Sequence, residues 1–251
     1  MSINHLSWML FVGFFYSACT DYVAQIEDKI EERERTSIIN QSSDDSRDTD
    51  VIGSMTDSRD GQKYKTVKIG EQIWMAENLN YETANSYCYN DNASYCSKYG
   101  RLYTWAAAMD SVGTWSKNGK GCGYGTTCSP TYPVRGICPE GWHLPTEAEF
   151  ETLFTAVGGK STAGKVLKST TGWTTYSGIT NEEAFAFSAL PAGGRYSNGS
   201  FSYEGDVANF WSSTEYNSFN AYYMYLYYDY DGADLYGSVK YYGFSVRCLK
   251  D

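Results

Sequence analysis

Residues 138–150 read CPEGWHLPTEAEF, and residues 243–248, close to the end of the sequence, read GFSVRC. Each stretch sets a cysteine beside a dense run of residues with strong local structural preferences. The first stretch enters a helix, and the second alternates apolar and polar residues as a strand does. Together they predict a domain whose middle is joined to its last strand.

The clearest helix of the sequence follows the first stretch and is expected over residues 146–157. Thr146 can cap it, Glu149 completes a capping box, and Gly158-Gly159 ends it. Its apolar residues recur at helical spacing and are Phe150, Leu153, Phe154 and Val157. This helix is expected to lay one side on a core.

The composition favours strands and turns over a helical bundle. The 251 residues include 24 tyrosines and 24 glycines but only 5 prolines, and 42% of them are hydrophobic. The formal net charge is −10, which argues against nucleic-acid binding because that needs a basic surface. Solubility is the simplest explanation of the acidity.

Seven cysteines are present, and they are Cys19, Cys88, Cys96, Cys122, Cys128, Cys138 and Cys248. Without Cys19, six remain, and six cysteines allow 15 disulfide connectivities. Closeness in the sequence ranks Cys88–Cys96 and Cys122–Cys128 first, which leaves Cys138 and Cys248 for each other. A zinc site is the alternative, but seven and five residues separate the close pairs, more than zinc ligands usually allow.

The N-terminal segment is typical of export. Trp8 to Phe15 is an apolar run too short to span a bilayer, and the small residues Ser17 and Ala18 precede Cys19. This resembles a bacterial lipobox, so we expect a signal peptide over residues 1–18 and lipidation of Cys19. An ordinary secretory signal with a leftover cysteine is the alternative. Both place the other cysteines in an oxidising compartment.

The rest of the chain divides into a linker and one domain. Residues 19–56 are expected to form the lipid-anchored N-terminus and an acidic, flexible linker rich in Ser and Asp. Residues 57–251 have the size of a single domain. We expect an α+β fold with two helices, antiparallel strands, long loops and disulfides.

Within that domain the expected elements follow the hydrophobic pattern. A hairpin is expected around residues 66–75, a helix over 101–110, a loop over 113–135 and the helix over 146–157. Strands are expected over 184–190, 209–215, 221–228 and 235–248, the last one broken near Gly237 or Gly243. Asp231-Gly232 is a hairpin turn signal.

Six segments resemble one known family, the Fibrobacter succinogenes major paralogous domain. They are residues 57–70, 72–79, 99–105, 138–146, 210–214 and 243–248. The resemblance covers nearly all of residues 57–251. It implies a relation to the C-type-lectin and formylglycine-generating-enzyme superfamily, and a secreted or lipid-anchored protein. The family is largely uncharacterised, so the resemblance implies a C-type-lectin-like fold and a location but little chemistry.

No catalytic constellation is recognisable. Once a signal peptide is removed, His143 is the only histidine, and we expect it to be a structural hydrogen-bonding residue, as we do for Arg247. Formylglycine-generating enzymes use a pair of reactive cysteines late in the chain, whereas here only Cys248 is late. We therefore expect no enzyme, no cofactor and no metal. The acids at Asp229, Asp231 and Asp234 superficially resemble a calcium loop, but we expect a plain acidic turn.

The tyrosine-rich segment 221–228 is the candidate binding site. Strand alternation places Tyr222, Met224, Leu226 and Tyr228 on one side, which we expect to face the core, and Tyr223, Tyr225 and Tyr227 on the other. An outward row of tyrosines can stack on sugar rings or on a partner protein. We assign Tyr223, Tyr225, Tyr227 and Trp211 to this ligand-binding surface. The alternative is that loops bury them.

The sequence therefore predicts a cell-envelope lipoprotein, anchored through its N-terminal lipid at the outer membrane or cell surface. Its domain is expected to be non-catalytic and to bind or adhere to a polysaccharide or an envelope protein. Two alternatives are an enzyme of the formylglycine-generating type acting on an envelope substrate and a purely structural envelope protein.

Overall fold

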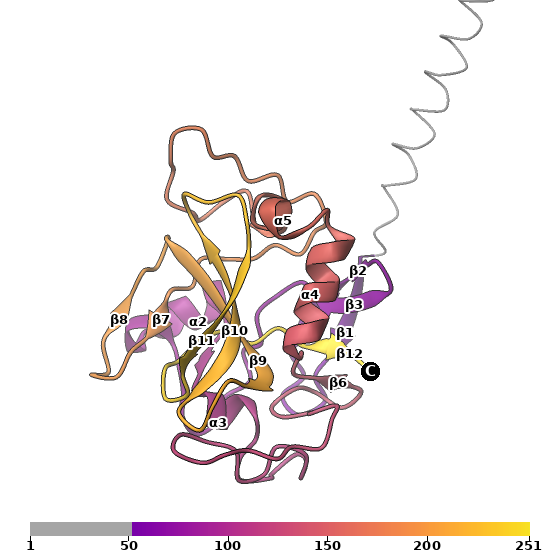
Figure 1. Cartoon of the computed structure of the whole chain (residues 1–251), viewed down its shortest axis with the longest axis vertical. Helices are drawn as coiled ribbons and strands as arrows, with labels where there is room; N and C mark the ends of the chain where they lie inside the picture. Colours follow the sequence, from indigo (N-terminus) through magenta and orange to yellow (C-terminus); the bar gives the residue numbers. More distant parts are fainter. Residues whose placement is uncertain (1–51) are drawn as a thin grey trace, which may run out of the picture. The chain divides into compact units, whose positions relative to one another are not determined.

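Residues 52–251 are the part of the chain that the computed structural model describes (Figure 1). The larger sheet has the strand order β1-β2-β3-β12-β6, formed by Gly53–Thr56, Lys63–Ile69, Gln72–Met75, Leu249–Lys250 and Trp142–His143. The smaller sheet has the order β11-β10-β9, formed by Asp234–Val239, Asn220–Tyr227 and Val207–Glu215. Two short pairs are β4 Ser86–Tyr87 with β5 Leu102–Tyr103, and β7 Gly194–Arg195 with β8 Phe201–Ser202.

The helices of this region are short. They are the 3₁₀-helix η1 Tyr89–Asp91 and the α-helices α2 Ala93–Tyr99, α3 Trp105–Ala108, α4 Glu147–Ala156 and α5 Lys160–Leu167. All strand pairings within the sheets are antiparallel. The mixed α+β class is therefore confirmed, but the expectation of two helices is wrong, because residues 52–251 contain four α-helices.

The larger sheet joins three distant parts of the sequence. The predicted hairpin is confirmed as β2 and β3, with Ile69 opposite Gln72 across the turn. The last strand, β12, lies between β3 and β6, so that Leu249 pairs with both Trp74 and His143. The end of the sequence thus fills the gap between an early hairpin and the middle of the chain, as the two opening segments predict.

Helix α4 is the predicted helix, and its capping box is present. Thr146 Oγ1 accepts a hydrogen bond from Glu149 N at 3.2 Å, and Glu149 Oε2 accepts one from Thr146 N at 2.7 Å. Phe150, Leu153 and Phe154 are buried. In Figure 1 the helix lies between the two sheets, and Phe150 stacks on Trp74 of the larger one.

Two main clusters of buried residues make up the core. One surrounds the disulfide Cys138–Cys248 and includes Trp105, Trp142 and Trp211. The other lies between α4, α5 and the two sheets and includes Phe210, Met224 and Leu226. Met224 and Leu226 are fully buried, as predicted for the core side of β10, whereas Tyr222 and Tyr228, predicted to share that side, are only partly buried.

The cysteines pair as the order in the sequence suggests. The disulfides are Cys88–Cys96, Cys122–Cys128 and Cys138–Cys248, with sequence separations of 8, 6 and 110. All six of these sulfur atoms are used, so none of them is left as a thiolate for zinc.

Two predicted elements are wrong in part. Residues 101–110 do not form one helix, because Leu102 and Tyr103 pair with β4 and only α3 is helical, capped by Thr104. Residues 184–190 form turns with a single bridge at Ala189, since Ala186 and Ser188 have positive φ angles. Packing overrides local propensity in both places.

Two further elements have no counterpart among the predicted ones. Helix α2 occupies part of the segment expected to be a loop between Cys88 and Cys96, and α5 follows directly after Gly159. The predicted final strand over 235–248 is only partly present: β11 ends at Val239, residues 243–245 form isolated bridges, and β12 begins at Leu249 in the other sheet.

The boundary predicted between linker and domain, at residue 57, lies too far toward the C-terminus. Strand β1 pairs along β2, from Gly53 opposite Thr66 to Thr56 opposite Lys63, so the folded unit begins before Asp57. The predicted signal peptide, Cys19 and most of the predicted linker lie outside the described residues. Within residues 52–251 no helix has the length and apolar character needed to cross a membrane.

Candidate aromatic binding surface

Trp211 is not available to a ligand. Its side chain is 0% exposed, its Nε1 donates a hydrogen bond to Tyr103 O at 2.8 Å, and its ring lies 4.6 Å from that of Phe244. The assignment of Trp211 to the binding surface is therefore wrong. It lies in the middle of β9, where the segment around Phe244 covers the sheet.

Tyr223 is also largely part of the core. It packs against the cluster that surrounds Cys138–Cys248, with its ring 4.9 Å from Phe244 and 6.2 Å from Trp211. Burial raises the pKa of its hydroxyl to about 12. Tyr223 lies on the predicted side of β10 with Tyr225 and Tyr227 and is half-buried, but Phe244 covers part of its ring.

Tyr225 and Tyr227 form the remaining part of the row and are half-buried. Their rings stack with centroids 5.8 Å apart and planes 18° apart. Tyr236 on β11 contacts Tyr225 at 6.0 Å and is 50% exposed. These three rings share one side of the smaller sheet, because Tyr236 stands opposite Tyr223 in the β10–β11 register.

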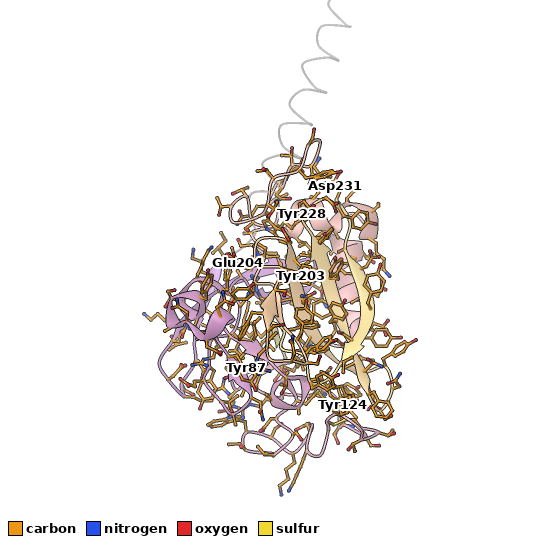
Figure 2. All side chains as sticks on the ribbon, turned by 90° about the vertical axis from the view of Figure 1, so that its left-hand side faces the viewer. Tyr87, Tyr124, Tyr203, Glu204, Tyr228 and Asp231 are labelled. Atoms are coloured by element: carbon orange, nitrogen blue, oxygen red, sulfur yellow. A yellow bond between two sulfur atoms is a disulfide. The ribbon has the colours of Figure 1, made fainter. Side chains whose placement is uncertain are left out.

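A second group of tyrosines comes from segments outside the sheet. Tyr196 contacts Tyr203 at 5.9 Å and Tyr242 at 4.9 Å. Tyr203 is 54% exposed, and Figure 2 places it in front of the smaller sheet, below Tyr228. Loop tyrosines therefore stand beside the row on β10.

Ring contacts continue from these rings through Tyr223 and the buried Phe244 to further exposed rings, and we call the series the aromatic track. Successive centroids lie 4.7–6.3 Å apart, within the range of attractive aromatic pairs. In Figure 2 the track runs from Tyr228 toward Tyr124. Its members in order are Tyr176, Tyr228, Tyr227, Tyr225, Tyr223, Phe244, Tyr242, Tyr241, Tyr124 and Phe219.

The lower end of the track is held rigidly. Tyr124 and Phe219 are each 51% exposed. Beneath them Lys240 is buried, and its Nζ donates to the carbonyl oxygens of Gly123, Thr126 and Ser218 at 3.1 Å and to the Glu215 carboxylate. Together with the Cys122–Cys128 disulfide, this ammonium group fixes the loop that carries Tyr124. Exposed rings on a fixed loop lose little entropy when a ligand binds.

Carboxylates line the upper end of the track. Asp234 stands directly opposite Tyr225 in the β10–β11 register, and Asp206 accepts a hydrogen bond from Thr174 Oγ1 at 2.7 Å. Burial and neighbouring tyrosines raise the pKa values of the Tyr225 and Tyr227 hydroxyls. These hydroxyls therefore keep their protons and can donate hydrogen bonds at neutral pH. Aromatic faces beside hydrogen-bonding groups suit a polyhydroxylated ligand.

The acidic turn between β10 and β11 is built around a buried lysine. Lys168 is 0% exposed, and its Nζ donates hydrogen bonds to Tyr227 O at 2.7 Å and Tyr230 O at 2.8 Å. Burial lowers the pKa of this amine to about 8. The turn thus has an internal cation, and in residues 52–251 no group of three or more His, Cys, Asp or Glu side chains could hold a metal ion.

His143 and Arg247 have structural partners. His143 is 6% exposed, with Nδ1 at 2.7 Å from Asp251 Oδ1 and Nε2 at 3.0 Å from Glu149 Oε1. Burial lowers the pKa of His143, but the two carboxylates outweigh it, so the net pKa is raised above 6.5. Arg247 is 0% exposed and hydrogen-bonds Asn78.

Sequence reasoning missed Tyr236, Tyr196, Tyr203 and Tyr242 as parts of this surface. The register of β11 against β10 is needed to find Tyr236, and the other three come from turns with no periodic pattern. The only signal in the sequence is the large number of tyrosines, 24 in all.

Comparison with known proteins agrees with the motifs in the sequence. A family model described as the Fibrobacter succinogenes major domain matches residues 67–250, which is well over half of the 251 residues. No curated protein and no solved structure matches the chain. The protein therefore belongs to the Fibrobacter succinogenes major domain family.

Proposed function

We propose that this protein is a non-catalytic, exported envelope lipoprotein that binds an extended polysaccharide along the aromatic track. The observation that carries the proposal is the series of ring contacts from Tyr176 to Phe219, in which half-exposed rings at both ends are connected through the buried Phe244. Sugar rings have apolar faces that stack on tyrosine, and a polymer can use several such contacts at once.

The charges of this face also support a glycan ligand. The formal net charge of −10 and the carboxylates at Asp206, Asp229 and Asp234 disfavour an acidic polymer. The tyrosine hydroxyls and these carboxylates can exchange hydrogen bonds with sugar hydroxyls. The expected polysaccharide is therefore neutral.

An enzyme of the formylglycine-generating type is the weaker candidate. Its chemistry needs reactive cysteines, whereas Cys248 is buried and forms a disulfide with Cys138. His143 is held between two carboxylates and lies away from the track. The relation to C-type lectins and the lipid anchor on Cys19 remain parts of the proposal.

The test uses the full-length protein, exported by a bacterial host so that its cysteines oxidise. We would measure its retention on insoluble cellulose and xylan, and its binding to a glycan array. The double variant Tyr225→Ser/Tyr227→Ser is expected to lose at least about tenfold in affinity. It removes half-buried rings from one side of the sheet and leaves Met224 and Leu226 in place.

The matched control is Tyr216→Ser. Tyr216 is 57% exposed and contacts Tyr222, which alternates with the track residues along β10. This variant is expected to bind like the wild type. Equal losses in both variants, or retention of a partner protein but of no glycan, would contradict the proposal.

A further inference from the structure

A polar pocket of about 290 Å³ lies apart from the rings of the aromatic track. Helix α2, the start of strand β2, the residues that follow β3, and the segment 169–190 line it. This volume is at the lower end of the range for small-molecule sites. Any ligand of the pocket would be small.

Three segments far apart in the sequence meet beneath this pocket. Asn78 Nδ2 donates a hydrogen bond to Tyr99 O at 2.8 Å, and Asn78 Oδ1 accepts one from Arg247 Nε at 2.7 Å. Asn78 and Tyr99 line the pocket, and Arg247 lies behind them, fully buried. One hydrogen-bond network therefore positions the floor.

One wall of the pocket has a strained backbone. Glu183, Ala186 and Ser188 have φ angles of 48°, 50° and 52°, a region that residues other than glycine seldom adopt. Each such residue costs on the order of 1 kcal/mol or more unless its surroundings enforce it, and such residues cluster at ligand sites.

Buried groups enforce this conformation. Arg247 donates to Phe187 O and, at 2.9 Å, to Ser188 O. The Glu183 carboxylate accepts from Thr170 N at 3.0 Å and from the Ser188 hydroxyl. No carboxylate among residues 52–251 forms an ion pair with Arg247. The buried guanidinium of Arg247 thus stabilises the strained backbone of this wall. The sheets and helices themselves do not require that conformation.

The charged side chains around the pocket include equal numbers of positive and negative groups. Lys65 and Lys98 carry two positive charges, and Glu77 and Glu183 carry two negative ones. Lys98 is also paired with Glu204 at 3.2 Å. The other polar side chains are amides and hydroxyls, and they include Gln62, Asn80, Ser97 and Thr171. This set has no surplus charge for an ion, but it has many groups that can both donate and accept hydrogen bonds.

We propose that this pocket binds a small, neutral, polyhydroxylated molecule, namely a single sugar ring. A sugar presents several hydroxyls that can pair with the amides, hydroxyls and carboxylates without introducing a charge. The proposal does not rest on the aromatic track, and it goes beyond polymer binding because the pocket has its own walls.

The test is a titration of the full-length, oxidised protein with small molecules, in which NMR chemical shifts and calorimetry measure binding. The probes are D-glucose, D-galactose and N-acetyl-D-glucosamine, with glycine, a zwitterion, and sodium acetate, an anion, as comparisons that carry formal charges. At least one sugar is expected to bind and to shift the signals of Lys98 and Glu183, whereas the charged comparisons are expected to leave them unchanged.

The blocking variant is Ser97→Trp, and its control is Ser94→Trp. Both residues are exposed on α2, but only Ser97 lines the pocket. The first variant is expected to weaken sugar binding by at least about tenfold, and the second to leave it unchanged. Circular dichroism is the check that both variants remain folded.

Three results would overturn this proposal: no sugar binds, Ser97→Trp binds as the wild type does, or acetate or glycine binds more tightly than any sugar. Loss of sugar binding in Tyr225→Ser/Tyr227→Ser but not in Ser97→Trp would support binding along the aromatic track and contradict binding in the pocket. The two proposals can therefore fail separately.

Discussion

At the scale of single residues, Arg247 is a fully buried side chain with four hydrogen-bond acceptors. Its guanidinium donates hydrogen bonds to Asn78 and to the carbonyl oxygens of Met75, Phe187 and Ser188, and it lies 4.6 Å from the Phe187 ring. Burial lowers its pKa to about 9, which still leaves it charged at neutral pH. Arg247 thus connects the pocket wall, at Phe187 and Ser188, to β3, at Met75.

Replacing Arg247 by Lys is expected to destabilise the protein by about 3–5 kcal/mol. A single ammonium group cannot reach all four acceptors, so buried carbonyl oxygens lose their donors. Urea unfolding followed by tryptophan fluorescence measures this loss. Arg135→Lys is the control, because Arg135 is only partly buried and hydrogen-bonds two carbonyl oxygens. A change below about 1 kcal/mol for Arg247→Lys would contradict the structural role.

His143 gives the protein a pH dependence that can be isolated, since it is the only histidine among residues 52–251. Its folded-state pKa lies above the unfolded value of 6.5. The stability it contributes is therefore present in full below pH 6.5 and is lost as the pH rises through the folded-state pKa.

The stability difference between wild type and His143→Gln is expected to be larger at about pH 5.5 than at about pH 9. Glutamine does not titrate, so the change in the difference reports the histidine. Thermal unfolding at both pH values measures it, and an NMR titration of the His143 ring gives the pKa directly. A ring pKa below 6.5 would contradict the assigned partners.

At the scale of the elements, α4 is the best predicted part of the chain. Thr146, Glu149 and Gly158 mark its ends locally, so its position follows from hydrogen bonds within one turn. The same Glu149 also contacts His143, which ties the start of the helix to β6. A local cap thus serves a tertiary contact as well.

Thr146→Ala is expected to cost about 1 kcal/mol of stability, because Glu149 N loses its acceptor. Thr146→Ser keeps the hydroxyl oxygen and is expected to cost only a small part of that. Chemical unfolding of the two variants measures the difference. Equal losses in both would show that the methyl group, and not the cap, stabilises the helix.

The structures of two other segments could not be predicted from their local sequence. Residues 101–110 include three alanines and favour a helix, yet Leu102 and Tyr103 pair with β4, and Tyr103 also bridges to Phe244. Residues 184–190 alternate like a strand, yet Arg247 holds two of their carbonyl oxygens in a turn. In each case a distant segment supplies hydrogen bonds that outweigh the local preference.

At the scale of the whole molecule, the Cys138–Cys248 disulfide fastens the segment before α4 to the one before β12. Both cysteines are 0% exposed and lie in the core cluster with Trp105 and Trp211. The loop that the disulfide closes spans 110 residues, so it removes much more freedom from the unfolded chain than the short loops do.

The double variant Cys138→Ser/Cys248→Ser is expected to lose about 4–5 kcal/mol of stability, and Cys122→Ser/Cys128→Ser about 2 kcal/mol. The chain-entropy cost of each loop grows with its length, and this sets the order. Denaturant unfolding of both oxidised variants measures it. A larger loss in the second variant would contradict this ranking.

The sequence by itself determined what depends on near neighbours: the capped helix α4, the β2–β3 hairpin, the core side of β10, the short disulfide loops and the family. Only the tertiary structure decided which tyrosines reach solvent. Trp211 is covered and Tyr223 is partly covered because Phe244, from the end of the chain, packs on them, while Tyr236 joins the row through the register of β11. The physical reason is that alternation fixes the side of a strand on which a residue lies, whereas burial depends on what the rest of the chain places on that side.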